Sequence, residues 1–320
     1  MTYEPVWGSI IAWYLFLAGL GGGAFIAAGI ASWLYPQAAR VRKIGRIIGI
    51  VTVCIGLALL MLDARAGFHN PWRFALLLDH LNTSVMSWGV VFLAVFMIIG
   101  FIALIVEIVD SCMRGAKAGG AFATKHPERV QKGVKLPEWL NIAGMFFALC
   151  VGGYTGALLG AVKTLPLWNH PLLPVLFLVS ALSTGFASVV LFGMIFARKE
   201  TEGIVKIKYM HFGMAVTEII LLGMMFFILN FHSVDAHATV VSILAGQWAP
   251  LFWVCMGGGG LVLPTLVEAW ELFIHKGGET PVVFGAGLVS EALVLMGGFF
   301  LRYLVIVAAL PAGFSAGFVF

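Results

Sequence analysis

Eight continuous apolar segments dominate this 320-residue sequence, and each is long enough to cross a lipid bilayer as an α-helix. The hydrocarbon core of a bilayer is roughly 30 Å thick, which requires about 20 mostly apolar helical residues. A transmembrane β-barrel would instead show short segments of alternating polarity. The sequence therefore predicts an all-α integral membrane protein with helices at about residues 9–34, 45–64, 85–109, 139–162, 171–197, 211–231, 249–274 and 284–310.

The composition excludes a soluble globule. Hydrophobic residues make up 61% of the chain and charged residues only 11%, whereas a soluble domain carries about 25% charged residues. No connection between the apolar segments is long enough to form a further domain. We therefore expect residues 1–320 to form a single membrane domain, arranged as two four-helix bundles in a lipid bilayer, with no nucleic-acid partner.

The basic residues between the segments are distributed unequally. Fifteen of the 19 Lys and Arg residues lie in the connections after the first, third, fifth and seventh segments, and only three lie in the connections on the opposite side. Cytoplasmic loops of membrane proteins carry an excess of Lys and Arg. The distribution predicts that both termini lie on the non-cytoplasmic side of a bacterial or archaeal cytoplasmic membrane.

Ionisable side chains inside membrane segments are costly, so each is a candidate functional group. One set falls at the predicted outer side: Tyr14, Asp63, Arg65, His69, Tyr154 and Arg302. Such groups can hydrogen-bond the two oxygens of a quinone and accept protons as a quinol loses electrons. In this interpretation Asp63, His69 and Tyr154 carry the chemistry, and Arg302 holds Asp63 ionised. The alternative is structural, with Asp63 and Arg302 forming an ion pair and the tyrosines anchoring the interface.

A second set of acidic residues lies deeper or toward the cytoplasmic side: Glu107, Glu218, Glu268 and Glu291. Glu218 and Glu291 are candidate positions in a proton pathway, because a carboxylate inside the membrane can pick up and release protons. Glu107 and Glu268 lie near the predicted ends of their segments. We therefore expect these two to be solvated residues at helix ends.

The histidines and cysteines argue against a bound haem, iron–sulfur cluster or metal ion. All eight histidines fall in connections or at the edges of the predicted segments, whereas a membrane di-haem protein needs facing pairs within the bilayer. The four cysteines are scattered without a CxxC pair. His232, Asp235 and His237 could bind a metal, but an exposed polar turn is the simpler interpretation. The sequence predicts no metal site.

Several ordered motifs resemble the NrfD/PsrC family of membrane subunits. The first segment reads WGSIIAWYLFLAGLGGGAF from Trp7 to Phe25, and PWRF and SVMSWG follow at 71–74 and 84–89. Further along, the sequence has YTG at 154–156, PLWN at 166–169, FLVSALSTG at 177–185 and GGFFLRY at 297–303. Each motif is short, but the ordered set extends over nearly the whole chain.

The resemblance implies an eight-helix protein that exchanges electrons between a membrane quinone (menaquinone or ubiquinone) and a four-cluster iron–sulfur subunit. That subunit would serve a molybdenum-containing catalytic subunit, so the protein would not be catalytic alone. Tyr154 matches the family's quinone-contacting tyrosine. The sequence departs from the family at Tyr14, where some members have histidine, at Ile11, where an asparagine is usual, and at Gly67, where an aspartate is common.

Two other classes of function remain open from the sequence. A secondary transporter or ion channel also has glycine-interrupted helices and buried glutamates. A purely structural anchor would use its ionisable residues for packing alone. The redox interpretation differs from both because it requires a partner subunit and a bound quinone.

Overall fold

The computed structural model describes residues 8–63, 84–116, 134, 136–275 and 280–311. Within this part of the protein, eight helices are long and apolar enough to cross a membrane, which confirms the predicted all-α membrane fold. Seven of them are α-helical throughout, with these bounds: α1 Ser9–Leu34, α2 Ala39–Asp63, α3 Val85–Ala116, α6 Glu138–Gly160, α7 Leu172–Phe196, α8 Thr201–His232 and α12 Pro281–Val307.

The seventh span is a composite of α- and π-helical turns. It consists of α10 Ala249–Leu251, η3 Phe252–Met256, η4 Gly258–Val262, α11 Leu263–Ala269 and η5 Trp270–Ile274. The η3, η4 and η5 turns are π-helical, as shown by bonds from the N–H groups of Gly257 and Val262 to carbonyls five residues earlier. π-Helical turns are rare and occur often at functional sites.

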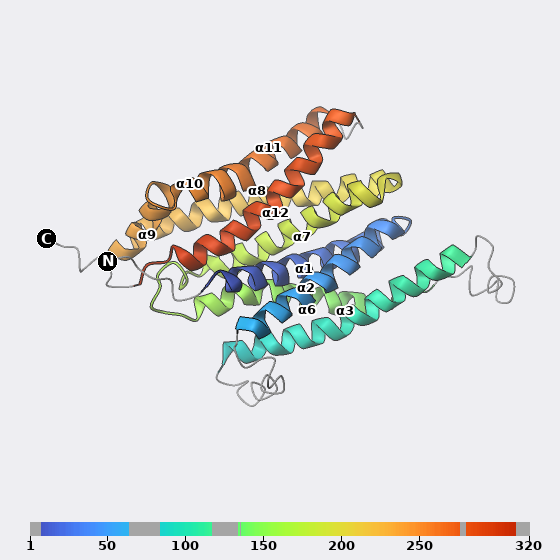
Figure 1. Ribbon diagram of the computed structural model, residues 1–320, viewed down its shortest axis with the longest axis horizontal. Coiled ribbons are helices and arrows are strands. Elements are labelled where there is room, and N and C mark those ends of the chain that lie inside the picture. Colours follow the sequence, from blue (N-terminus) through green and yellow to red (C-terminus); the bar gives the residue numbers. More distant parts are fainter. Residues whose placement is uncertain (1–7, 64–83, 117–133, 135, 276–279, 312–320) are drawn as a thin grey trace.

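The eight spans form two four-helix halves (Figure 1). The N-terminal half contains α1, α2, α3 and α6, and the C-terminal half contains α7, α8, the composite span and α12. The halves meet where α1 crosses α7, and Gly23 and Gly185 bring the two backbones together there. A Cβ atom on either glycine would overlap the opposing backbone, as is typical of close helix packing in membranes.

Several helices extend beyond the predicted apolar segments. α2 begins at Ala39 rather than 45, and α8 begins at Thr201 rather than 211. The added turns carry charged residues that the hydropathy pattern assigns to solvent; Arg40, Glu202 and Lys206 are exposed, but Lys208 is buried by neighbouring helices. Among the described residues, the short helix η2 Arg198–Glu200 precedes α8 within the sixth span, and α9 Val234–Leu244 follows it, with a Ser233 cap that accepts the N–H of Ala236.

The first residues of α1 and the last residues of α12 lie at the same end of the molecule (Figure 1). We call this the outer end, and we call the opposite one, with the α1–α2 and α7–α8 connections, the basic end. The assignment of these ends to sides of a membrane stays a prediction from the distribution of charge.

Candidate functional site

Three of the predicted outer residues lie near one another at the outer end. Tyr14 on α1 interacts electrostatically with Asp63 at the end of α2 and with Tyr154 on α6. The Tyr154 hydroxyl donates to the carbonyl of Met86 at 3.4 Å. Gly89 in the SVMSWG motif makes room for this tyrosine, because a Cβ at that position would overlap the Tyr154 ring.

The environment of this group is partly open. Tyr14 and Tyr154 are half-buried and Asp63 is exposed. The residues Arg65 and His69 of the predicted set lie outside the described residues. The structure therefore brings together half of the predicted outer set: two phenols and a carboxylate.

Arg302 does not form the expected ion pair with Asp63. It is fully buried within the protein, and its Nη1 donates to Ser180 Oγ at 3.2 Å and to the Gly298 carbonyl at 2.7 Å. Its Nη2 donates to the Phe177 carbonyl at 3.5 Å. The predicted pairing is wrong because α12 packs against α7, which directs the guanidinium away from α2. The acid that interacts electrostatically with Arg302 is Glu218.

Glu218 occupies the middle of α8 and faces α7. Its carboxylate interacts with the hydroxyls of Ser180 and Ser183 and with Arg302. Next to it lies a small cavity of about 10 Å³, lined by glycines at 260, 297 and 298. That volume is close to the minimum for one water molecule. Glu218 is therefore buried among polar partners and not against lipid.

A second group of buried ionisable residues lies one to two helical turns from Glu218, toward the basic end. His211 Nδ1 lies 3.0 Å from Glu268 Oε1 and 3.6 Å from Glu291 Oε2. His211 Nε2 lies 3.3 Å from the Ser183 hydroxyl, which connects this group to Glu218. The expectation that Glu268 is a solvated cap is wrong, because only 1% of it is exposed. The π-helical span packs against α12, and this packing buries Glu268.

Lys208 joins this group to the surface. Its ammonium forms an ion pair with Glu271 and lies 3.7 Å from Glu291 Oε1. Lys208 and Glu271 also line a cavity of about 400 Å³ at the basic end, between α7, α8, η5 and the start of α12. Both oxygens of Glu291 are buried without a hydrogen-bond partner among the described protein atoms.

The buried groups form a continuous series through the C-terminal half. From the basic end to the outer end, it contains Lys208 and Glu271, then Glu291, Glu268 and His211, then Ser183, Glu218, Ser180 and Arg302. Sequence reasoning identified Glu218 and Glu291 but missed Lys208, His211 and Glu271. Their spacing contained a signal, since residues three apart share a helix face, as Lys208 and His211 do on α8.

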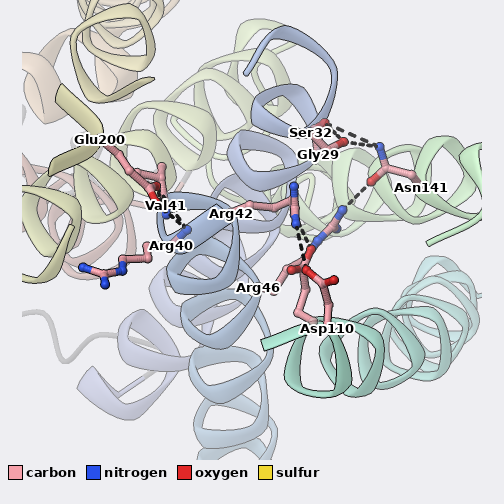
Figure 2. A network of polar contacts seen from close by, with 10 residues as sticks. Gly29, Ser32, Arg40, Val41, Arg42, Arg46, Asp110, Asn141 and Glu200 are labelled. Atoms are coloured by element: carbon pink, nitrogen blue, oxygen red, sulfur yellow. Dashed lines mark hydrogen bonds and ion pairs between the residues drawn. The ribbon is translucent and has the colours of Figure 1, made fainter. Parts of the chain in front are cut away.

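The N-terminal half contains a separate polar network at its own basic end (Figure 2). Arg42 Nε lies 2.5 Å from Glu107 Oε1, and Arg42 Nη2 lies 3.8 Å from Asp110 Oδ2. Arg46 donates to the side-chain oxygen of Asn141, whose nitrogen donates to Ser32 Oγ at 3.2 Å. Glu107 is therefore buried and paired, which corrects its expected role as a solvated cap.

The histidines also require a correction. The sequence places His211 at the edge of a span, but α8 begins ten residues earlier and buries it inside the bundle. It faces carboxylates and Ser183 in the described structure, which is unlike the facing histidines of a di-haem site. Near α9, His237 Nδ1 lies 2.8 Å from Asn230 Oδ1. The absence of haem, clusters and metal ions stays a prediction.

The fold and these buried groups define a multi-pass α-helical membrane protein with ionisable residues enclosed between its helices. The chain belongs to the NrfD family: the family profile described as "Polysulphide reductase, NrfD" matches residues 1–312. A polysulfide reductase component of Wolinella succinogenes is 32% identical over 271 residues, with 82% of this sequence and 83% of that protein covered.

Two further relatives extend the comparison. The protein NrfD of Escherichia coli is 31% identical over 310 residues, with 93% of this sequence and 94% of that protein covered. A selenate reductase subunit of Mesobacillus selenatarsenatis is 27% identical over 305 residues, with 83% of this sequence and 67% of that protein covered. The resemblance seen in the sequence motifs is thus confirmed at the level of the family.

Proposed function

We propose that this protein is the quinone-binding membrane subunit of a respiratory oxidoreductase in a bacterial or archaeal cytoplasmic membrane. Two relatives are named as parts of polysulfide and selenate reductases, which supports a role within a multi-subunit reductase. In this proposal electrons pass between membrane quinone and a four-cluster iron–sulfur partner, which serves a molybdenum-containing subunit. The membrane subunit provides the quinone site and holds no haem or cluster of its own.

The observation that carries this proposal is that Tyr14 interacts electrostatically with both Asp63 and Tyr154 at the outer end. The residues come from α1, α2 and α6, and all three are at least partly exposed. A quinol that is oxidised releases two electrons and two protons, so its oxygens need hydrogen-bond partners and proton acceptors. The phenols of Tyr14 and Tyr154 can orient the headgroup, and the Asp63 carboxylate can accept a proton.

The rest of the predicted set completes the site in this proposal. Arg65 and His69 follow Asp63 in the sequence, and we expect His69 to accept a proton and Arg65 to contact the headgroup. Electrons leave directly to the partner, docked over the same connection. Arg302 acts indirectly, since it is buried beside Ser180 and its guanidinium lies 5.8 Å from the ring of Phe16, two residues after Tyr14.

The buried series in the C-terminal half supports an additional role in proton movement. The cavity beside Lys208 and Glu271 gives access from the basic end, and Glu291 and Glu218 lie further inside. We propose that Glu291 and Glu218 carry protons between this cavity and the outer site. The serine hydroxyls and the small cavity beside Glu218 provide places where a proton or a water molecule can bridge the carboxylates.

Replacement of the two proposed headgroup partners tests the quinone site. Tyr154→Phe and Asp63→Asn should each lower quinol-linked turnover of the intact complex roughly tenfold or more, because each removes a hydrogen-bonding or proton-accepting group. Assembly should be unchanged. Tyr209→Phe is a matched control, since its hydroxyl lies at the other end and donates to the Leu272 carbonyl at 3.3 Å. Unchanged turnover in both site variants would contradict the proposal.

A secondary transporter is the second candidate, favoured by the interrupted seventh span and by a cavity that reaches buried carboxylates. The redox subunit requires a partner subunit and a bound quinone, whereas the transporter requires neither. Purification in mild detergent, followed by mass spectrometry of co-purifying proteins and extracted lipids, separates them. A cysteine-rich partner with bound quinone supports the redox subunit, whereas a protein that purifies alone without quinone supports the transporter.

A further inference from the structure

The N-terminal half has a cavity of about 500 Å³ at its basic end, which the proposed quinone function does not use. It lies among the end of α1, the start of α2, the late part of α3 and the start of α6. Its polar lining consists of Ser32, Arg42, Arg46, Glu107, Glu138 and Asn141. Exposed tryptophans flank it at Trp33, which is 45% exposed, and Trp139, which is 69% exposed. Tryptophans in such positions are typical of the level of lipid headgroups.

Arg46 is the group in this cavity that lacks a matching partner. It is only 1% exposed, and its Nε and Nη1 atoms have no hydrogen-bond partner among the described protein atoms. Its Nη2 donates to Asn141, and the guanidinium lies 3.9 Å from the centre of the Phe25 ring. The nearby carboxylates of Glu107 and Asp110 are engaged by Arg42. A buried cation with two unused donors favours an anionic group in the cavity.

The two arginines approach the same region from α2. Figure 2 shows the Arg42 and Arg46 side chains pointing together into the space between α2, α3 and α6, with Asn141 approaching from α6. A guanidinium donates two parallel hydrogen bonds to phosphate oxygens, so this arrangement suits a phosphate.

The charges of the cavity distinguish between headgroups. The lining contains two basic side chains, Arg42 and Arg46, and two acidic ones, Glu107 and Glu138. The lining is therefore balanced, which disfavours a headgroup with net negative charge. Glu138 is exposed, whereas the guanidinium of Arg46 is buried. A headgroup with a phosphate for Arg46 and an ammonium for Glu138 fits this separation of charge.

We propose that this cavity binds the phosphoethanolamine headgroup of a membrane phospholipid. The phosphate lies beside Arg46 and Arg42, the ammonium donates to Glu138, and the acyl chains leave toward lipid past Trp33. Bound in this way, the lipid supplies the acceptors that Arg46 lacks. It also fills the space between helices whose side chains do not meet there.

Native mass spectrometry of the full-length protein in mild detergent, after removal of endogenous lipid, tests this inference. Phosphatidylethanolamine, phosphatidylcholine, phosphatidylglycerol and inorganic phosphate are added separately, and bound fractions are compared. We expect phosphatidylethanolamine to bind roughly tenfold more weakly to Arg46→Gln, because charge-assisted hydrogen bonds are lost. Arg40→Gln is the matched control, since it removes an exposed guanidinium at the same end that does not line the cavity.

Glu138→Gln keeps the test decisive if Arg46→Gln does not fold. Glu138 is exposed, so its substitution leaves the packing intact, and it should abolish the preference for phosphatidylethanolamine over phosphatidylcholine, whose amine cannot donate. Equal binding of the three lipids to the wild type would overturn the proposal. So would inorganic phosphate that competes fully with the lipid, because it would show a free anion site. Neither outcome bears on quinone turnover.

Discussion

The two halves of this protein bury charges at the same end in a similar arrangement but with different chemistry. In the N-terminal half, Arg42 and Arg46 on α2 lie near Glu107 and Asp110, three residues apart on α3. In the C-terminal half, Lys208 and His211 on α8 face Glu268 and Glu271, which are also three residues apart. The fourth helix contributes Asn141 in the first half and Glu291 in the second.

This difference separates a fixed network from one that can exchange protons. An arginine guanidinium stays protonated under all physiological conditions, and an asparagine amide carries no exchangeable charge. Histidine and glutamate side chains can each gain and lose a proton. The same helix arrangement can therefore hold the protein together in one half and support proton movement in the other. Substitutions of corresponding residues in the two halves test this difference.

The largest effect is expected from Lys208→Met. Removal of one partner from a buried ion pair costs about 3–5 kcal/mol, because the remaining charge is buried without compensation. Glu271 and Glu291 would lose their common cation. Chemical denaturation in detergent measures the change, and a second substitution, Glu271→Leu, should recover a large part of it. The corresponding Arg42→Met should cost less, because the side chains of its ion pair with Glu107 are 12% and 9% exposed, against 7% and 4% for Lys208 and Glu271. Equal losses would contradict the proposed difference in enclosure.

An intermediate effect is expected for proton movement. Glu291→Gln should lower quinone-linked proton transfer in proteoliposomes roughly a hundredfold, because a positioned proton-transfer group contributes about 10²–10⁴-fold. Glu107→Gln removes a buried carboxylate in the fixed network and should leave the rate within about twofold. A pH-sensitive dye inside the vesicles gives the rate. Equal rates for wild type and Glu291→Gln would remove this series of residues as the pathway.

The smallest effect is expected in the pH dependence of stability, at a histidine that lies outside the spans and outside the C-terminal network. His170 lies between α6 and α7, and burial, with a contribution from His232, lowers its pKa. The neutral ring accepts the Leu172 N–H at 3.3 Å. Stability from neutral His170 is present above the unfolded pKa of about 6.5 and is lost as pH falls through that value toward the lowered folded pKa.

His170→Asn removes this titration and keeps an acceptor. In the wild type, the free energy of unfolding falls below about pH 6.5 as His170 gains a proton. In the variant this fall should be smaller, by less than about 1 kcal/mol. Thermal unfolding at several pH values measures the difference between the two proteins. The pH dependence that remains in the variant then belongs to other groups. An identical pH dependence would show that His170 titrates as it does in the unfolded state.

The spans were predictable because their signal is strong and continuous. Residues 9–34 and 249–274 match helix or span limits in the structure. The ends of α2 and α8 were not predictable from hydropathy, since Arg46 and Lys208 look like residues of a basic loop. Neighbouring helices bury both of them, and that burial depends on contacts between segments far apart in the sequence.

The sequence could indicate which residues lie near the candidate site, but not which side chains contact one another. The sequence placed Tyr14, Asp63 and Tyr154 at one level, and in the structure Tyr14 interacts electrostatically with both of the others, while their role stays a prediction. It could not show that Arg302 turns toward Ser180, because that depends on how α12 packs against α7. The burial of Glu268 was hidden for the same reason. Depth along a helix can be read from a sequence, whereas the direction of a side chain around the helix axis requires the packed bundle.

The π-helical turns of the seventh span determine how the gene can change. Each such turn holds one residue more than an α-helical turn, which rotates everything after it by about 100°. Two of these turns, η3 and η4, precede Glu268. Loss of one codon within the glycine run at 257–260 can be absorbed by conversion of a π-turn to an α-turn, whereas loss of one codon from the α-helical residues 263–267 would turn Glu268 and Glu271 away from His211 and Lys208, while the span kept its hydropathy. A deletion that looks harmless by membrane topology would thus remove two charges from the interior.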